Sequence, residues 1–269
     1  MPEWSFALLA GYVGLGLVTG FVAGLLGVGG GLVIVPVLIM QLQAHGLGVG
    51  MEVQIALGTS LAVIVFTSLS SVRAHHRHGA VDWLLVRRIA VGALFGTFVG
   101  ALFAARVPGQ ALKIFFVIFL FYAAIQMWLD FRPAPHRGLP GRARGTLAGG
   151  VIGAVSSWIG IGGGTLSVPF MLWHGVPLHR AIATSAAIGF PIALAGAAGY
   201  VVGGLSVAGR PTGSFGFLYL PALAGIVIGS VLTAPLGART AHRLPVHRLK
   251  RIFALLLFAL ALRMAWTIE

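Results

Sequence analysis

The sequence predicts an all-α polytopic membrane protein made of two inverted-topology repeats. Three observations predict this class: an apolar composition, long stretches without charge, and a glycine-rich motif that occurs twice. Of the 269 residues, 58% are hydrophobic and 9% are charged, whereas about 25% of the residues of a soluble domain are charged. This composition leaves too little polar surface to keep a globule in water, so we expect the lipid bilayer to be its solvent.

The uncharged stretches are long enough to cross a membrane. A transmembrane helix needs about 20 apolar residues, and about 17 are sufficient. Asp, Glu, Lys and Arg are absent from Trp4–Met51, Val53–Val72, Ile89–Ala105, Ile114–Leu129, Gly145–Trp173, Ala181–Gly209 and Pro211–Ala238. None of these stretches alternates strictly between apolar and polar residues, as a lipid-facing barrel strand does. The predicted spans are therefore helices.

The expected elements follow one another in two halves. The first repeat, residues 1–130, should hold a helical hairpin broken at a glycine-rich turn and then three crossing helices. Its first apolar segment should be retained, because Met1-Pro2-Glu3-Trp4 lacks the basic region of a signal peptide. A basic linker covers residues 131–144, and residues 145–269 form the second repeat. The predicted helices after the hairpins include 89–105, 112–130, 180–203 and 215–237.

The two halves share motifs in the same order. Gly27-Val28-Gly29-Gly30-Gly31, followed by Pro36, recurs as Gly160-Ile161-Gly162-Gly163-Gly164, followed by Pro169. Thr59-Ser60 recurs as Thr184-Ser185. An odd number of crossings between equivalent elements inverts one repeat relative to the other, which is typical of secondary transporters. Each broken hairpin is either re-entrant or spans the bilayer, and because the segment before the second turn is short, a re-entrant or interrupted hairpin is favoured.

Basic residues predict the orientation, because short loops rich in Lys and Arg stay in the cytoplasm. They gather in three groups: Arg73, Arg77, Arg87 and Arg88; Arg132, Arg137, Arg142 and Arg144; and Arg239, Arg243, Arg248, Lys250 and Arg251. With these groups inside, both termini are periplasmic and the protein lies in a bacterial inner membrane. The net charge of +13 then marks orientation, and we expect the bilayer, but no nucleic acid, as a partner.

The two glycine-rich turns are the candidate substrate site. Consecutive glycines disfavour a continuous helix, and a helix that starts behind each turn would direct free amide hydrogens and the positive end of its dipole toward it. Such helix starts bind small anions. The candidate binding residues are Gly29, Gly30, Gly31, Thr59, Ser60, Gly162, Gly163, Gly164, Thr165, Thr184 and Ser185. Ser156, Ser157 and Trp158 are weaker candidates.

Ordinary helix packing competes with this hypothesis, because small residues are common where membrane helices touch. We assign Gly92, Gly96 and Gly100 and the pair Gly225 and Gly229 to packing, since their spacing suits helix contacts. Packing does not require three consecutive glycines, so we assign the turns to function. For the Thr-Ser pairs the residues alone favour neither role clearly.

The sequence gives little support for an enzyme active site, a metal site or a cofactor site. The turns lack the sixth-position glycine and the preceding strand of a dinucleotide fingerprint. His75, His76 and His78 are placed in a basic cytoplasmic loop, where a metal site is not expected. No carboxylate pair falls within a predicted span, so we expect no catalytic residues, no metal and no cofactor. Anion export could then be driven by the membrane potential alone, at about 2.3 kcal/mol per charge for 100 mV.

The residues at 24–36 (GLLGVGGGLVIVP) and 158–169 (WIGIGGGTLSVP), together with ALGTS at 56–60 and AIATS at 181–185, resemble the TauE/SafE sulfite exporter family. The resemblance covers nearly the whole chain. It implies a transporter of a small sulfur-containing anion, such as sulfite or an organosulfonate. An anion channel is an alternative function that the sequence leaves undecided, and a membrane-embedded enzyme or assembly factor is another. The substrate, the direction, any coupling ion and a possible homo-oligomer are not determined by the sequence.

Overall fold

The computed structural model describes residues 6–27, 29–129, 138–241 and 246–268. In these ranges the elements are α1 (Phe6–Leu26), α2 (Gly31–Ala44), α3 (Glu52–Arg77), α4 (Trp83–Ala104), α5 (Gly109–Leu129), α6 (Arg142–Ile159), α7 (Gly164–Trp173), α8 (Leu178–Gly204), β1 (Ser214–Phe215), β2 (Leu218–Tyr219), α9 (Leu220–Ala241) and α10 (Val246–Trp266). Six helices, α1, α3, α4, α5, α8 and α9, are long and apolar enough to cross a bilayer by length and composition. The predicted class, a polytopic helical membrane protein, is confirmed.

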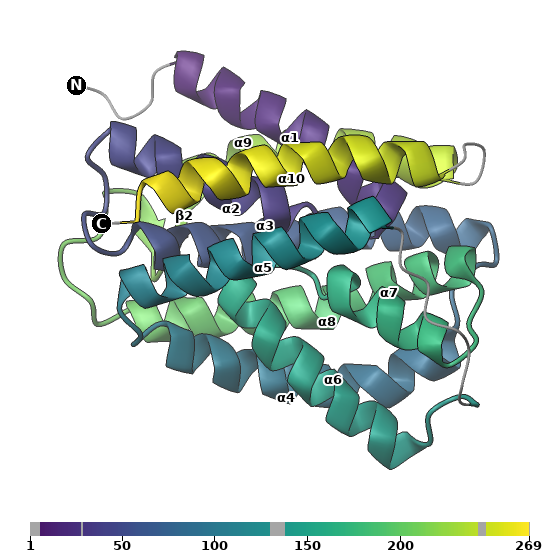
Figure 1. Ribbon diagram of the computed structural model, residues 1–269. Coiled ribbons are helices and arrows are strands. Elements are labelled where there is room, and N and C mark those ends of the chain that lie inside the picture. Colours follow the sequence, from purple (N-terminus) through teal and green to yellow (C-terminus); the bar gives the residue numbers. More distant parts are fainter. Residues whose placement is uncertain (1–5, 28, 130–137, 242–245, 269) are drawn as a thin grey trace.

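The helices form a bundle (Figure 1), and the sequence places different charge at its two ends. The start of α1 and the end of α10 lie at one end of the bundle, on the left in the figure. The end of α3, the start of α4, the start of α6, the end of α9 and the start of α10 lie at the other end. These segments carry the described members of the three basic groups. At that end the Arg88 guanidinium donates a hydrogen bond of 2.8 Å to the carbonyl of Pro140. We call this end the basic end.

Small residues bring two pairs of outer helices into close contact, α1 with α9 and α6 with α4. A Cβ atom on Gly24 would lie 2.0 Å from the Ala234 carbonyl oxygen, and one on Gly92 would lie 1.8 Å from the carbonyl oxygen of Thr146. No side chain fits in such spaces. The packing role predicted for Gly92, Gly96, Gly100, Gly225 and Gly229 is confirmed, since a Cβ atom at each of them would clash with the facing helix.

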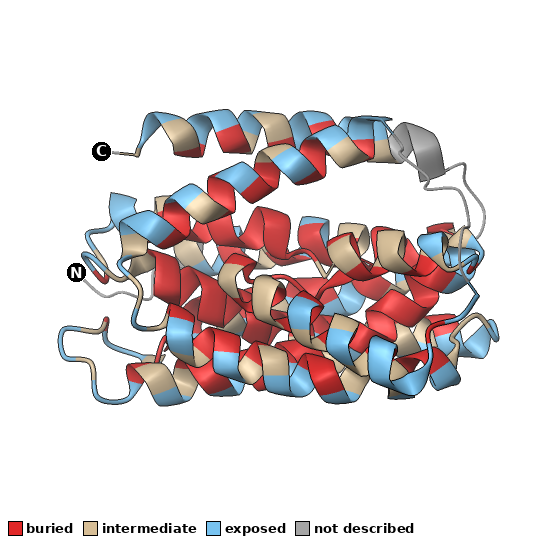
Figure 2. Ribbon diagram, turned by 60° about the horizontal axis from the view of Figure 1, so that its bottom comes forward, coloured by how far each residue is buried: buried red, intermediate tan, exposed pale blue. Residues whose placement is uncertain are grey.

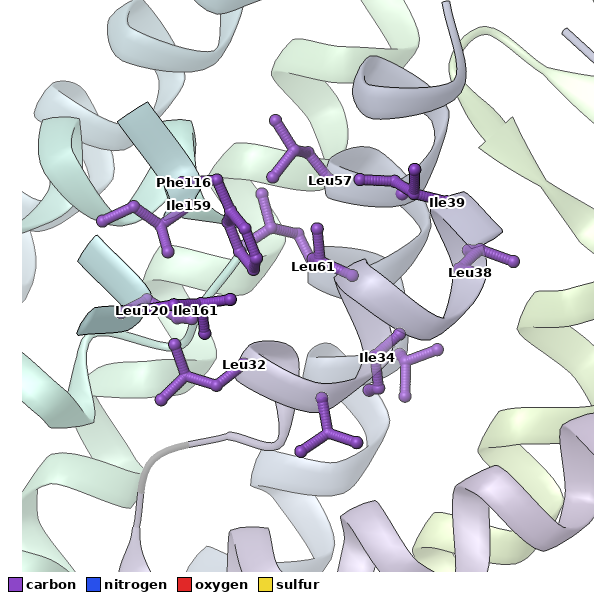
Figure 3. Packing of buried hydrophobic residues seen from close by; sticks show 14 of the residues in the cluster. Leu32, Ile34, Leu38, Ile39, Leu57, Leu61, Phe116, Leu120, Ile159 and Ile161 are labelled. Carbon is purple, nitrogen blue, oxygen red and sulfur yellow. The ribbon is translucent and has the colours of Figure 1, made fainter. Parts of the chain in front are cut away.

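The central helices are α3 and α8, and the short helix α2 lies beside α3. Figure 3 shows Leu32, Ile34, Leu38 and Ile39 of α2 packed with side chains of α3 and α5. They also pack with Ile159, which precedes the second glycine-rich turn, and with Ile161, which lies in it. The outer faces remain apolar, as lipid contact requires: Leu147 is 71% exposed and Phe95 is 72% exposed. In Figure 2 the buried residues fill the interior and the exposed residues lie outside.

The structure corrects three details of the sequence prediction. His75 and His76 belong to the last turns of α3, and His78 caps it, so they do not lie in a loop; α3 simply continues past Val72 for five further residues. The helix expected from residue 215 starts at Leu220, because Gly213 and Gly216 take left-handed conformations (φ 80° and 59°) that form the β1–β2 hairpin.

The third correction concerns the linker. α6 begins at Arg142, so the last residues of the predicted linker 131–144 are helical. Residues 130–137, which hold Arg132 and Arg137, lie outside the described residues. Arg243, in 242–245, lies outside them too.

Candidate functional site

Each half begins with a helical hairpin that reverses at its glycine-rich turn. The residues that precede α2 and α7 are Gly30 and Gly163, whose φ angles of 76° and 77° are left-handed. Glycine adopts this conformation without a steric penalty. α2 has 14 residues and α7 has 10, fewer than the roughly 20 that a crossing requires. Neither short helix is long enough to complete a crossing. Each returns toward the end of the bundle from which its hairpin started, as Figure 1 shows for α6 and α7.

The two turns meet inside the bundle. A Cβ atom on Gly29 would lie 3.1 Å from the amide nitrogen of Gly162, and one on Gly31 would lie 2.1 Å from the carbonyl oxygen of Gly160. Apart from Gly29, which is half-buried, these glycines are buried. Residues separated by more than 100 positions in the sequence thus form one backbone contact, which only glycine allows.

The helix starts behind both turns leave amide hydrogens without an acceptor in the part of the chain that the structure describes. Gly163 O accepts hydrogen bonds from Leu166 N and Ser167 N, and Gly30 O accepts from Val33 N and Ile34 N. Among the described residues, no acceptor takes the amide hydrogens of Gly29–Leu32 or of Gly162–Thr165. Free amides and the positive end of a helix dipole favour a bound anion.

A small cavity lies between the turns. It is lined by Gly27, Gly29 and Gly162, by Ala23, Ala186, Gly189 and Ile64, and by the hydroxyl side chains Thr67, Ser68 and Ser71 of α3. Its volume of about 10 Å³ is roughly that required to hold one water molecule. In this conformation the exposed wall of the cavity is almost entirely apolar, and the cavity is too small for a sulfur oxyanion.

The Thr-Ser pairs lie beside the turns and fix them in place. The Ser60 hydroxyl donates to the carbonyl of Gly160 at 2.7 Å. The Ser185 hydroxyl shares its hydrogen between the carbonyl of Ile182 in its own helix, at 2.8 Å, and the carbonyl of Gly27, at 3.2 Å. Each serine therefore ties its own half to the turn of the other half. Both serine hydroxyl hydrogens are directed to protein carbonyls in this conformation, so their predicted bonds to an anion stay a prediction.

The threonines of the pairs hold the starts of outer helices. Thr59 Oγ1 accepts a hydrogen bond from Tyr219 N at 2.9 Å, just before α9. Thr184 Oγ1 accepts one from Asp82 N at 3.0 Å, just before α4. Both threonines are fully buried and neither lines the cavity between the turns.

The sequence prediction missed the polar residues of α3 that line the cavity. Thr67, Ser68 and Ser71 follow the spacing i, i+1, i+4, and His75 follows at i+8, so they share one helix face. Thr67 Oγ1 donates to Ser230 Oγ at 2.9 Å, and Ser71 Oγ is buried with no partner in the described part of the chain. This spacing within an apolar helix was the signal that could have identified them.

Further buried hydroxyls surround the second turn. Ser156 Oγ, Thr165 Oγ1 and Ser167 Oγ have no partner among the described residues. Thr165, a predicted site residue, and Gly164 line a second cavity of about 50 Å³, together with Gln126 and Lys250. The second turn is thus richer in hydroxyl groups than the first. Ser167 was not predicted from the sequence.

The three histidines at the end of α3 point to different places. His75 Nε2 lies 3.2 Å from the carbonyl oxygen of Gly24, and His76 Nδ1 lies 3.2 Å from the indole nitrogen of Trp83, which donates to it. His78 lines a separate cavity near Arg73. Within the described residues, no group of three or more His, Cys, Asp or Glu side chains could hold a metal ion.

Comparison with known proteins gives one consistent result. The family model described as sulfite exporter TauE/SafE matches residues 12–264. A probable membrane transporter protein of Haemophilus influenzae is 36% identical over 97% of this chain and 98% of its own length. The probable membrane transporter protein YunE of Bacillus subtilis is 31% identical over 74% of this chain and 80% of its own length. A probable membrane transporter protein of Xylella fastidiosa is 27% identical over 94% of each chain. No solved structure matches this chain.

Proposed function

The chain belongs to the TauE/SafE sulfite exporter family, and from that premise we propose that it carries a small sulfur-containing anion, such as sulfite or an organosulfonate, across the bacterial inner membrane. The family and the relatives establish the general class of the protein, which is a multi-pass membrane transporter and not an enzyme. The substrate class comes from the family, and the chemistry of the turns is consistent with it.

One observation carries the proposal. Two glycine-rich turns from opposite halves touch, at Gly29 and Gly162, and both begin helices whose first amides have no described acceptor. Anions are stabilised at helix starts, and hydrogen bonds to a charged group contribute about 1.5–3 kcal/mol each. Four to six such bonds would offset much of the cost of removing water from a small anion. The substrate site includes Gly29–Gly31 and Gly162–Thr165.

Inverted repeats explain why the contacts occur in matched pairs. The bond from Ser60 to Gly160 has a counterpart from Ser185 to Gly27. The contact of α1 with α9 likewise has a counterpart in that of α6 with α4. Matched contacts are expected if residues 1–130 and 145–269 are related by a two-fold axis in the membrane plane, joined by the linker 131–144. Alternating access then occurs when one repeat rocks against the other.

The cavity volume implies that this conformation is a closed state. About 10 Å³ between the turns does not admit an oxyanion, so transport requires the turns to separate. Under the positive-inside rule, the basic end faces the cytoplasm and both termini are periplasmic. Thr67, Ser68 and Ser71 extend along α3 from the turns toward that end, which makes them the cytoplasmic route to the site.

The test is flux in proteoliposomes of the purified protein. We expect uptake or release of sulfite that saturates with concentration and is competed by short sulfonates, together with a rise in melting temperature on binding. Flux that never saturates would favour a channel over a transporter. The absence of binding and flux for sulfite, sulfate, thiosulfate and sulfonates would reject the substrate class while leaving the family membership intact.

A further inference from the structure

A large cavity lies away from the glycine-rich turns, between α3 and α9 at the basic end. Its volume is about 310 Å³. Arg73 and Arg77 of α3 and Arg239 in the last turn of α9 line it. Within the described part of the chain, no residue accepts a hydrogen bond from these three guanidinium groups and no acidic side chain lines the cavity. The cavity is therefore strongly cationic.

A hydrogen bond between the two helices forms the inner wall of this cavity. Proline has no amide hydrogen, so Pro235 leaves the carbonyl of Val231 without its helical donor. The Ser70 hydroxyl donates to that carbonyl at 3.2 Å. Ser70 and Pro235 both line the cavity. The bond ties α3 to α9 just inside the arginines, so the cavity is a built feature of the helix pair.

An apolar stripe continues from the cavity toward the middle of the bundle. On α3, Phe66 precedes Ser70 by one helical turn and is 48% exposed. On α9, Ile228 and Leu232 precede Pro235 by about two turns and one turn, and they are 54% and 65% exposed. Helical spacing puts these side chains on the faces that line the cavity. We call the cavity and this stripe together the α3–α9 cleft: it is apolar inside and cationic at the basic end.

The corresponding helix pair in the second half, α8 with α4, is closed. Counted from the Thr-Ser pairs, Ala198 and Val202 stand where the first half has Arg73 and Arg77. A Cβ atom on Gly199 would lie 2.6 Å from Cβ of Ala101, and one on Gly203 would lie 2.4 Å from Cβ of Ala105. Small residues therefore bring α8 and α4 into direct contact. An open cationic cleft is not a general consequence of the fold.

We propose that the α3–α9 cleft binds an anionic phospholipid, with its phosphate among Arg73, Arg77 and Arg239 and an acyl chain along the apolar stripe. Guanidinium groups match phosphate oxygens in geometry and charge, and basic groups near a membrane surface attract anionic lipids. A free phosphate would use only the cationic end. The apolar stripe and the position of the cleft on the outer face of the bundle select a lipid.

Native mass spectrometry of the purified full-length chain tests this proposal with phosphatidylglycerol, phosphatidylcholine and glycerol 3-phosphate as probes. The test variant carries Arg73→Gln, Arg77→Gln and Arg239→Gln. The matched control carries Arg87→Gln, Arg142→Gln and Arg144→Gln, which removes the same charge from exposed positions at the same end.

We expect the parent chain and the control to bind phosphatidylglycerol well above phosphatidylcholine. The test variant should bind phosphatidylglycerol about a hundredfold more weakly. An equal loss in both variants, or no loss in the test variant, would overturn the proposal. Glycerol 3-phosphate bound as tightly as phosphatidylglycerol would also overturn it, because the site would then recognise a free anion.

A second variant, Leu232→Ser, tests the apolar stripe without touching the arginines. Leu232 is mostly exposed, so the fold should tolerate the change. We expect phosphatidylglycerol binding to fall about tenfold while any binding of glycerol 3-phosphate is unchanged. Lipid binding that is unaffected would remove the stripe from the site. Because none of these readouts depends on sulfite flux, their outcome is independent of the proposed transport function.

Discussion

The central helices of the two halves differ most where they leave the glycine-rich turns. α3 lines this path with Thr67, Ser68, Ser71 and His75. Counted from the Thr-Ser pairs, the equivalent positions of α8 are Ile192, Ala193, Gly196 and Tyr200. Both sets are buried, but only the first offers a row of small hydroxyl groups. α3 therefore offers a polar buried face and α8 an apolar one, which we call the polar path and the apolar path of the proposed transport mechanism.

The last residue of each set contacts the preceding hairpin at a matched place. His75 Nε2 lies 3.2 Å from the carbonyl oxygen of Gly24 on α1, and the Tyr200 hydroxyl donates to the carbonyl of Ser157 on α6 at 2.9 Å. Gly24 and Ser157 both stand three residues before their first turn glycine. The backbone positions are conserved between the halves, whereas the chemistry of the lining is not. The asymmetry teaches that the two central helices present different chemistry at equivalent positions.

The largest effect is expected at the turns, which both paths share. Gly30→Val and Gly163→Val should each abolish anion flux, because a β-branched residue is strained by a φ near +76° or +77° and would fill the space next to the amides. Flux and membrane insertion are measured in parallel. Gly46→Val is the matched control, with φ +63° and open space around it. Normal flux in both turn variants would remove the turns from the mechanism.

The polar path is tested by removing its hydroxyl groups. The double change Ser68→Ala and Ser71→Ala should weaken the apparent affinity for the anion by about thirtyfold, since each hydroxyl contributes about 1 kcal/mol. Saturation curves in proteoliposomes measure the change. Ser206→Ala, at an exposed position, should have no effect. If the double variant keeps the parent affinity, the anion does not pass along α3.

The two threonines should differ in their effect on stability. Thr59→Val removes the acceptor of Tyr219 N, which belongs to a residue that is 1% exposed, and should cost about 1–3 kcal/mol of unfolding free energy. Thr184→Val removes the acceptor of Asp82 N. Asp82 is only half-buried, so water can replace the threonine and the cost should be smaller. Thermal unfolding in detergent measures both, and the reverse order would contradict this account.

The smallest effect is expected on the apolar path. Tyr200→Phe removes the hydroxyl that ties α8 to the carbonyl of Ser157 and should lower the free energy of unfolding by about 1 kcal/mol. Tyr122→Phe, at a position that is 47% exposed, serves as the control for loss of a tyrosine hydroxyl. Equal melting temperatures for the parent and the Tyr200 variant would show that this bond does not stabilise the contact of α8 with α6.

Much of the fold could be read from local sequence. Uncharged stretches such as 181–209 predict membrane-spanning helices, because charge is costly in a bilayer. Consecutive glycines at 29–31 and 162–164 predict helix breaks, because each glycine weakens a helix. The packing glycines were also recognisable, since the spacing of Gly92 and Gly96 puts both on one helix face. These features depend on neighbours within a few residues, and no knowledge of the tertiary structure is needed to interpret them.

The tertiary structure alone decided which groups meet. Whether Ser60 donates its hydrogen to an anion or to Gly160 depends on a residue 100 positions away, and the role of Thr67 depends on Ser230 of another helix. The end of α3 at Arg77 and the start of α9 at Leu220 depended on how those segments pack. The sequence by itself determined a helical membrane protein with two broken hairpins. Long-range packing decided that their turns touch, because hydrogen bonds and close contacts between distant segments leave no periodic pattern in the chain.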